Sequence, residues 1–158
     1  METGAIFDST ERYRYRLWRI WNRHVPTITF IMLNPSRADH RVNDPTVRRC
    51  LNFAQTWSCG GLEVVNLFAY RTAYPQQLKQ ANDPIGIDND HHLKQVFEQS
   101  AQVILAWGNQ GTWLNRNQAV LDLIRPQYQP YCLGFTKQGQ PRHPLYAKRD
   151  LTPIRFDR

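Results

Sequence analysis

Three polar side chains occupy positions in this sequence from which they could bind a ligand or take part in catalysis. Asn34 and Asn66 each follow a run of apolar, strand-forming residues, and His143 lies in a polar segment near the end of the chain. A carboxamide carries one acceptor oxygen and a two-proton donor, so each asparagine could read the edge of a nucleobase or hold a water molecule. A histidine in such a segment could donate a hydrogen bond to negative charge that develops during a reaction.

The neighbouring residues leave a simpler alternative open. Asn34, Pro35 and Ser36 form a triplet that is common in surface turns, and His143 precedes a proline that also suits a turn. If the triplet is functional, Pro35 fixes the turn, while Ser36 and the backbone amides after it could hold a phosphate. The choice depends on whether the fold brings the three polar side chains together.

Apolar runs and helix signals alternate along the chain, as is typical of an α/β sheet. Continuous apolar runs predict buried strands, as parallel sheets require, at residues 27–33, 62–70, 101–107 and 131–135. Helices are predicted at residues 44–60, 88–100 and 109–124. In the first helix Asp44 can act as the N-cap, Pro45 suits the first turn, and Gly60-Gly61 can end it. Asp88 can cap the second.

A further strand is predicted at residues 12–21, where arginines alternate with larger apolar side chains. A short connection leads to residues 27–33, so the two segments are expected to pair as an antiparallel hairpin. The arginines of this strand either form a solvated edge that discourages aggregation or contact phosphates.

These elements predict the fold class: a three-layer α/β sandwich in one domain over residues 1–158, with a central, mainly parallel sheet of about four strands plus an N-terminal antiparallel hairpin. In such sheets, ligands bind beyond the carboxyl ends of the strands. Asn34, Asn66 and Gly108 all fall at predicted carboxyl ends. We therefore expect them to converge on one rim of the sheet.

Composition narrows the class of partner. Lysine and arginine number 20 against 13 acidic residues, which gives a net charge of +7. This excess favours a nucleic acid or nucleotide partner, although a basic enzyme with no such partner has the same composition. The apolar runs are far shorter than a membrane span needs, and no signal pattern opens the chain. A cytoplasmic protein without membrane contact is expected; its oligomeric state is left open.

No cofactor is predicted, because dinucleotide, P-loop, zincin and serine-hydrolase motifs are missing from the sequence. The three cysteines are too scattered for a disulfide framework or a metal site. The segment Asp88–His92 could be a metal cluster, but helical geometry lets few of its side chains face each other. We interpret it as a capped, solvated helix start and predict no metal.

Six short motifs, in order, carry a resemblance to a bacterial family, domain-of-unknown-function family number 1643. They read MLNPSRAD, NDPTVRRC, VVNLFAYR, DNDHHL, AWG and HPLY. The match runs from about Tyr13 to Tyr146. This family resemblance implies no particular activity.

A more distant resemblance is to the uracil-DNA glycosylase superfamily. Leu33-Asn34-Pro35-Ser36 is similar to its first motif, with Leu33 and Ser36 in place of glycines. The strand ending in Asn66, the pair Trp107-Gly108 and the pair His143-Pro144 resemble its later motifs in the same order. The last of these lacks the superfamily's Ser-Pro-Leu-Ser continuation.

This resemblance implies the superfamily's fold and a role for each matched residue. Asn34 would position water or contact a base, Asn66 would read the base edge, and His143 would stabilise the departing anion. Leu145 or Tyr146 would stand where the superfamily wedges a side chain into the duplex. For stacking on the base, Phe53 and Phe68 are the candidates.

The predicted site therefore has three parts. Asn34 and His143 are the expected catalytic residues. Substrate binding is expected from Asn66, Ser36, Phe68, Arg71 and Gly108, and nucleic-acid contact from Arg48, Arg49, Lys148 and Tyr146. The predicted function is recognition of a nucleobase with hydrolysis of an N-glycosidic bond in DNA, a nucleoside or a nucleotide. A non-catalytic nucleotide or nucleic-acid binding module and an enzyme acting on another small anionic metabolite are the alternatives.

Overall fold

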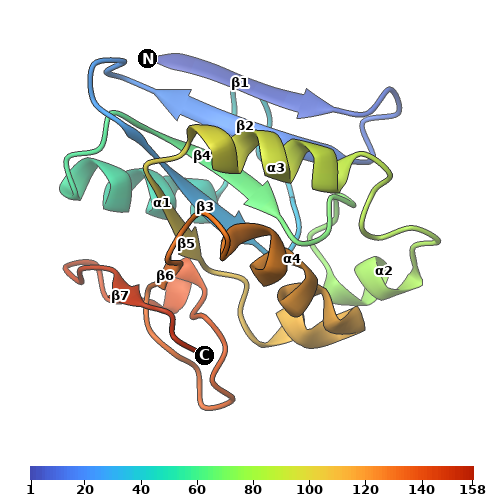
Figure 1. Ribbon diagram of the computed structural model, residues 1–158. Helices are drawn as coiled ribbons and strands as arrows, with labels where there is room; N and C mark the ends of the chain where they lie inside the picture. The colour runs from blue at the N-terminus through green and yellow to red at the C-terminus, as the bar shows by residue number, and fades with distance from the viewer.

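A seven-stranded mixed sheet forms the centre of the computed structural model, which describes residues 1–158 (Figure 1). Its strands are β1 (Glu2–Phe7), β2 (Arg14–Ile20), β3 (Thr27–Met32), β4 (Gly61–Asn66), β5 (Gln102–Leu105), β6 (Tyr131–Cys132) and β7 (Ile154–Arg155). Their order is β1-β2-β4-β3-β5-β6-β7, with β4, β3, β5 and β6 parallel and the outer strands antiparallel. The predicted α/β class is confirmed, but the sheet has more strands than predicted.

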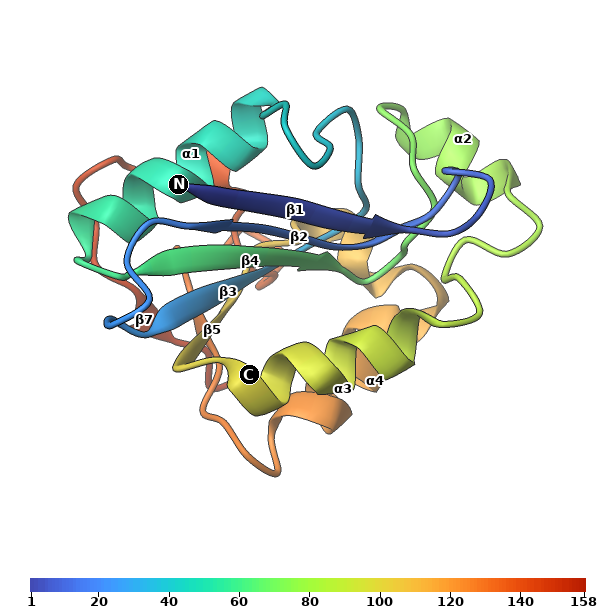
Figure 2. The ribbon, with the colours of Figure 1, turned by 90° about the horizontal axis from the view of Figure 1, so that it is seen from above.

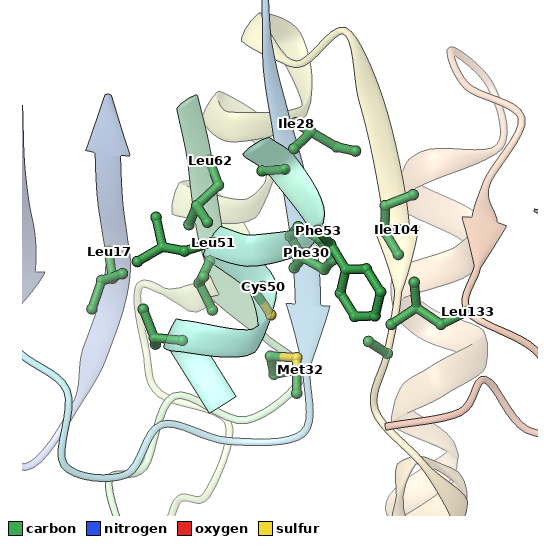
Figure 3. Close-up of a cluster of buried hydrophobic side chains, with 14 of the residues drawn as sticks. Leu17, Ile28, Phe30, Met32, Cys50, Leu51, Phe53, Leu62, Ile104 and Leu133 are labelled. Carbon is green, nitrogen blue, oxygen red and sulfur yellow. The ribbon is translucent and has the colours of Figure 1, made fainter. Parts of the chain in front are cut away.

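Helices cover both faces of the sheet (Figure 2). The α-helices are α1 (Pro45–Thr56), α2 (Pro75–Gln80), α3 (Asn89–Gln99) and α4 (Arg116–Ile124), and two 3₁₀ helices are η1 (Asn109–Asn115) and η2 (Pro144–Tyr146). Helix α1 lies on one face, where Phe53 and Cys50 pack over Phe30 and Met32 of β3 (Figure 3). Helices α3 and α4 lie on the other face, over a second buried cluster. Burial on both faces explains why the central strands are continuously apolar.

Helix α1 begins as its sequence predicts. The Asp44 carboxylate accepts from the backbone N of Val47 at 2.9 Å, and Pro45 occupies the first turn. The helix ends at Thr56, before the predicted glycine stop, and Ser58 takes the left-handed turn with φ of +59°. Gly60 instead allows the close approach of the segment before β3, because a Cβ there would lie 2.2 Å from the carbonyl oxygens of Asn22 and Val25.

The N-terminal hairpin differs from the prediction. Strand β2 pairs with β1 and β4, and not with β3. Because β1 shields β2 on its outer side, β2 is not an edge strand. Arg14 and Arg19 are buried, and Arg19 donates to Asn43 Oδ1 at 2.9 Å and to Asp39 O at 2.7 Å. The expectation of a solvated arginine edge is therefore wrong for these two residues.

Other predicted boundaries also shift. The helix predicted at 109–124 is split into η1 and α4, since Leu114 and Asn115 adopt positive φ. Asp88 makes no side-chain capping bond at the start of α3. The strand predicted at 131–135 is only two residues long as β6. None of the helices is long and apolar enough to cross a membrane.

The parallel strands contain a topological switch point at β3. From β3 the chain crosses through α1 to β4 on one side, and from β4 through α3 to β5 on the other side of β3. Crevices form beyond the carboxyl ends of strands at such a switch point. Antiparallel β2 begins at the same rim, where the Arg14 amide donates to Ala69 O just beyond β4 at 3.0 Å.

Candidate functional site

A cavity of about 530 Å³ lies beyond the carboxyl ends of β3, β4 and β5. Its size is within the range typical of small-molecule sites, about 300–1,000 Å³. Asn34, Asn66 and His143 all line it, although they are far apart in the sequence. Ser36, Gly108 and Tyr146 line it as well. The structure thus brings six of the residues selected from sequence to one cavity; their chemical roles remain predictions.

Asn66, the last residue of β4, lies at the inner wall of this cavity and is only 1% exposed. Its Nδ2 and Oδ1 are both buried, and neither has a hydrogen-bond partner in the protein. A buried polar group without a partner costs about 1–3 kcal/mol. Asn66 is the one side chain in which both polar atoms are buried without a partner, and it lies in the cavity wall.

The backbone around Asn66 is held by a buried polar network that sequence reasoning missed. Asn89 Nδ2 donates to Asn66 O at 3.0 Å and to Leu67 O at 3.1 Å. Arg116 Nε donates to the same Leu67 oxygen at 2.8 Å, and its Nη2 pairs with Asp90. The segment interpreted as a solvated helix start therefore fixes the end of β4. The only sequence feature that could have indicated this network is Asn89 at the start of a predicted helix. Asparagine is usually exposed there, so its burial was not expected.

Asn34 uses the two sides of its carboxamide differently. Nδ2 donates to Thr72 O at 2.7 Å and to Pro35 O at 3.0 Å, which ties the loop after β3 to the loop after β4. Oδ1 makes no hydrogen bond within the protein, and the residue is half-buried in the cavity wall. Asn34 can therefore offer an oriented acceptor to a water molecule or a ligand.

His143 is held in a defined protonation state. Its Nδ1 accepts from the backbone N of Leu145 at 3.2 Å, at the start of η2. Burial lowers the pKa of His143, and the carboxylate of Asp44 opposes this effect. At neutral pH the ring is therefore uncharged with its proton on Nε2. A neutral imidazole of this kind is a hydrogen-bond donor for developing negative charge.

Several residues shape the mouth of the cavity. Gly108 has φ of +74° and ψ of −169°, and a Cβ there would meet nothing within 4 Å. Ser36 Oγ makes no hydrogen bond in the protein, so it is free for a ligand. Leu145 and Tyr146 are exposed at the rim, Tyr146 by 79%.

Other predicted residues do not reach the cavity. Phe68 is fully buried against Trp113, with ring centroids 5.0 Å apart, in the cluster under α4. The predicted stacking role of Phe68 is therefore wrong, because its side chain points into the core. Phe53 is likewise buried in the cluster under α1. Trp107 and Tyr146 are the aromatic residues of the cavity lining; Trp107 is 2% exposed, and its Nε1 donates to Gln140 Oε1 at 3.1 Å.

The predicted basic contacts also lie outside the cavity lining. Arg71 Nε donates to Ser36 O at 2.9 Å, and its guanidinium lies 4.8 Å from the ring centroid of Phe7. Arg71 thus holds the Ser36 loop in place from outside the cavity lining. Arg48, Arg49 and Lys148 belong to the surface around α1 and η2, where Arg49 donates to Ala147 O at 3.4 Å.

One charged residue of the cavity was considered from sequence only as one of the arginines of a predicted strand. Arg14 is 2% exposed, lines the cavity, and donates through Nη1 to Ala38 O at 3.0 Å. Its Nε is buried without a partner. Burial lowers the pKa of Arg14 to about 10, an effect opposed by Asp44, so the guanidinium remains charged at neutral pH. The cavity thus contains a buried cation beside its neutral amides.

No group of three or more histidine, cysteine, aspartate or glutamate side chains is arranged to hold a metal ion. Comparisons with curated proteins and with solved structures found no match. A family model described as "Protein of unknown function (DUF1643)" matches residues 14–145, which is most of the chain. On this match, the chain belongs to the DUF1643 family.

Proposed function

We propose that this protein binds a nucleobase in the cavity and hydrolyses its N-glycosidic bond. The observation that carries the proposal is the buried, unpaired carboxamide of Asn66 at the cavity wall. Base edges present neighbouring donors and acceptors, which a carboxamide pairs with simultaneously. A base seated there satisfies both polar atoms of Asn66 and removes their cost.

The remaining cavity groups suit the bond cleavage. Water bonds to the sugar carbon while the C–N bond breaks and its electron pair leaves with the base. Asn34 Oδ1 accepts a hydrogen bond from the water, and His143 Nε2–H donates to the base as negative charge develops on it. Trp107 supplies an aromatic surface beside the ring. The proton released by water passes to solvent.

Kinship with the uracil-DNA glycosylase superfamily, including its three-layer sandwich, is part of this proposal. Its support is the order of the short motifs, together with helices on both faces of the sheet. The end of each matched strand contributes a residue to one cavity: Asn34, Asn66 and Gly108.

A non-catalytic binding module is the second candidate, and one observation favours it. Asp44 is the only carboxylate in the cavity wall. Its oxygens accept from the backbone N of Val47 at 2.9 Å and of Ala38 at 3.3 Å, so it serves the fold. Activation of water would then rest on a neutral amide alone. In this case the cavity holds a base without cleaving its bond.

Release of free base, measured by chromatography, separates the two candidates. Wild-type protein is incubated with nucleosides, nucleotides and DNA carrying modified bases, and its affinity for the same compounds is measured by calorimetry. We expect base release that falls about 100-fold in Asn34→Ala and His143→Gln while affinity is retained. Asn52→Ala and His91→Gln change exposed side chains of the same types and serve as controls.

Binding without release at any substrate supports the binding module. Failure of every nucleoside, nucleotide and DNA to bind contradicts both candidates. Equal loss of release in the control variants would show that the effect is not local to the cavity.

A further inference from the structure

We infer that the cavity contains a phosphate subsite built on Arg14, and that its ligand is a free nucleoside monophosphate. The base half of this ligand rests on the function proposed above. The phosphate half rests on a separate set of residues, at the start of β2 and in the loop after β3.

Arg14 has unused hydrogen-bonding capacity in a buried position. The guanidinium makes one hydrogen bond, from Nη1 to Ala38 O. Nε is buried without an acceptor, and Nη2 makes no hydrogen bond within the protein. Guanidinium groups bind phosphate through paired N–H donors, which makes arginine the residue best matched to that anion. The missing partner of Arg14 is therefore an acceptor with several oxygens.

No carboxylate forms an ion pair with Arg14, although Asp44 and Asp39 partly oppose the lowering of its pKa by burial. The ion pairs of the molecule are Arg16–Glu63, Arg23–Glu2, Arg116–Asp90 and Arg155–Asp157, and none includes Arg14. Both oxygens of nearby Asp44 already accept from backbone amides. A buried cation without an ion pair is costly unless a ligand neutralises it. The charge of Arg14 thus indicates an anionic ligand.

The loop that contacts Arg14 offers further donors. The backbone N–H groups of Ser36 and Arg37 donate to no acceptor in the protein, and neither does Ser36 Oγ. Ala38 O binds Arg14 and Ser36 O binds Arg71, so the loop is fixed at both carbonyls. Ser36 lines the cavity together with Arg14, so its free amide and hydroxyl can contribute to an anion-binding concavity.

Burial favours a small ligand over a polymer. Arg14 is 2% exposed, so a phosphate must enter the cavity to reach it. The phosphodiester of a polymer carries chain on both sides, whereas a monophosphate ends at that group. The cavity of about 530 Å³ is of small-molecule size. These features together favour a mononucleotide.

Calorimetry on the protein of residues 1–158 tests this inference. The ligands are the common nucleosides, their 5′- and 3′-monophosphates, inorganic phosphate and a short single-stranded oligonucleotide. We expect a monophosphate to bind about 10- to 100-fold more tightly than its nucleoside, the range of a charge-assisted contact. In Arg14→Gln this ratio should fall close to one while nucleoside affinity is unchanged. Arg125→Gln, an exposed arginine at the end of α4, is the control.

Ser36→Ala keeps the test decisive if Arg14→Gln does not fold. Ser36 Oγ makes no bond in the protein, so its loss should weaken monophosphate binding several-fold and leave nucleoside binding and the melting temperature unchanged. A wild-type ratio near one, a ratio that neither variant changes, or an oligonucleotide that outcompetes every monophosphate overturns the inference.

The two proposals fail in different ways. Nucleoside binding without a preference for the phosphorylated form removes the phosphate subsite and leaves the nucleobase function standing. Arg14-dependent binding of inorganic phosphate, with no binding of any nucleoside, keeps the subsite and removes the nucleobase function.

Discussion

Replacement of Asn66 by leucine should make the ligand-free protein more stable. Leucine has the same branched skeleton but no polar atoms, so Asn66→Leu removes two buried groups that lack partners. Each such group costs about 1–3 kcal/mol. Two groups at the lower end give a gain of about 2 kcal/mol, which corresponds to a rise in melting temperature of about 4–8 °C for a chain of this size.

Asn89→Leu is the matched control. Asn89 is also fully buried and its Oδ1 likewise lacks a partner, but its Nδ2 donates to the carbonyl oxygens of Asn66 and Leu67. Loss of these two bonds should outweigh the removal of one unpaired oxygen, so the same substitution should here reduce the free energy of unfolding by about 1 kcal/mol. Urea titrations followed by circular dichroism measure both changes.

Opposite signs at Asn66 and Asn89 distinguish a ligand-reading amide from a structural one. Asn66→Leu should also abolish nucleoside binding despite its greater stability, a trade-off typical of functional sites. If Asn66→Leu destabilises the protein as much as Asn89→Leu does, the Asn66 carboxamide is needed for folding and the reasoning about its unmet hydrogen bonds is refuted.

Three further predictions concern two glycines and two histidines. Gly108→Ala should cost about 2 kcal/mol in a urea titration, because φ of +74° with ψ of −169° is strained for alanine while its Cβ meets no neighbour. Gly111→Ala would place a Cβ 2.1 Å from Trp107 Cδ1, so displaced Trp107 should weaken nucleoside binding and shift the tryptophan emission. Burial lowers the pKa of both His92 and His143, so the folded protein binds fewer protons than the unfolded chain just below pH 6.5. The free energy of unfolding should therefore fall as pH drops below about 6.5, and His92→Gln should reduce that slope.

The convergence of Asn34 and Asn66 on one rim of the sheet could be predicted from local patterns. Asn34 and Asn66 follow apolar runs that become β3 and β4, and parallel strands place their carboxyl ends on one rim. Met32 and Asn66 are paired neighbours in the sheet. His143 was selected as a site residue because of a short motif in a segment without a predicted helix or strand. Only the tertiary packing of η2 brings it to the cavity.

The residues that sequence reasoning missed depend on long-range pairing. Strand β1 has a weak apolar pattern, so its pairing with β2 could not be predicted from the sequence. The burial of Arg14 could not be predicted either. Register is irregular between Ile6 and Phe7, where β1 pairs first with Arg16 and then with Arg14. Such a shift changes which face of β2 an arginine occupies, and no local periodicity specifies it. The prediction for Phe68 was wrong because of tertiary packing: Phe68 is buried in the cluster that α3 and α4 cover.

Side-chain amide resonances of the ¹⁵N-labelled protein provide the most direct test of the cavity's role. The Asn66 signal is assigned by its loss in Asn66→Leu, and nucleosides and monophosphates are then titrated into the wild type. We predict that the signals of Asn66 and of the His143 ring shift together and saturate, while the Asn89 signal moves little. Saturable binding that leaves Asn66 and His143 unshifted would contradict nucleobase recognition in this cavity.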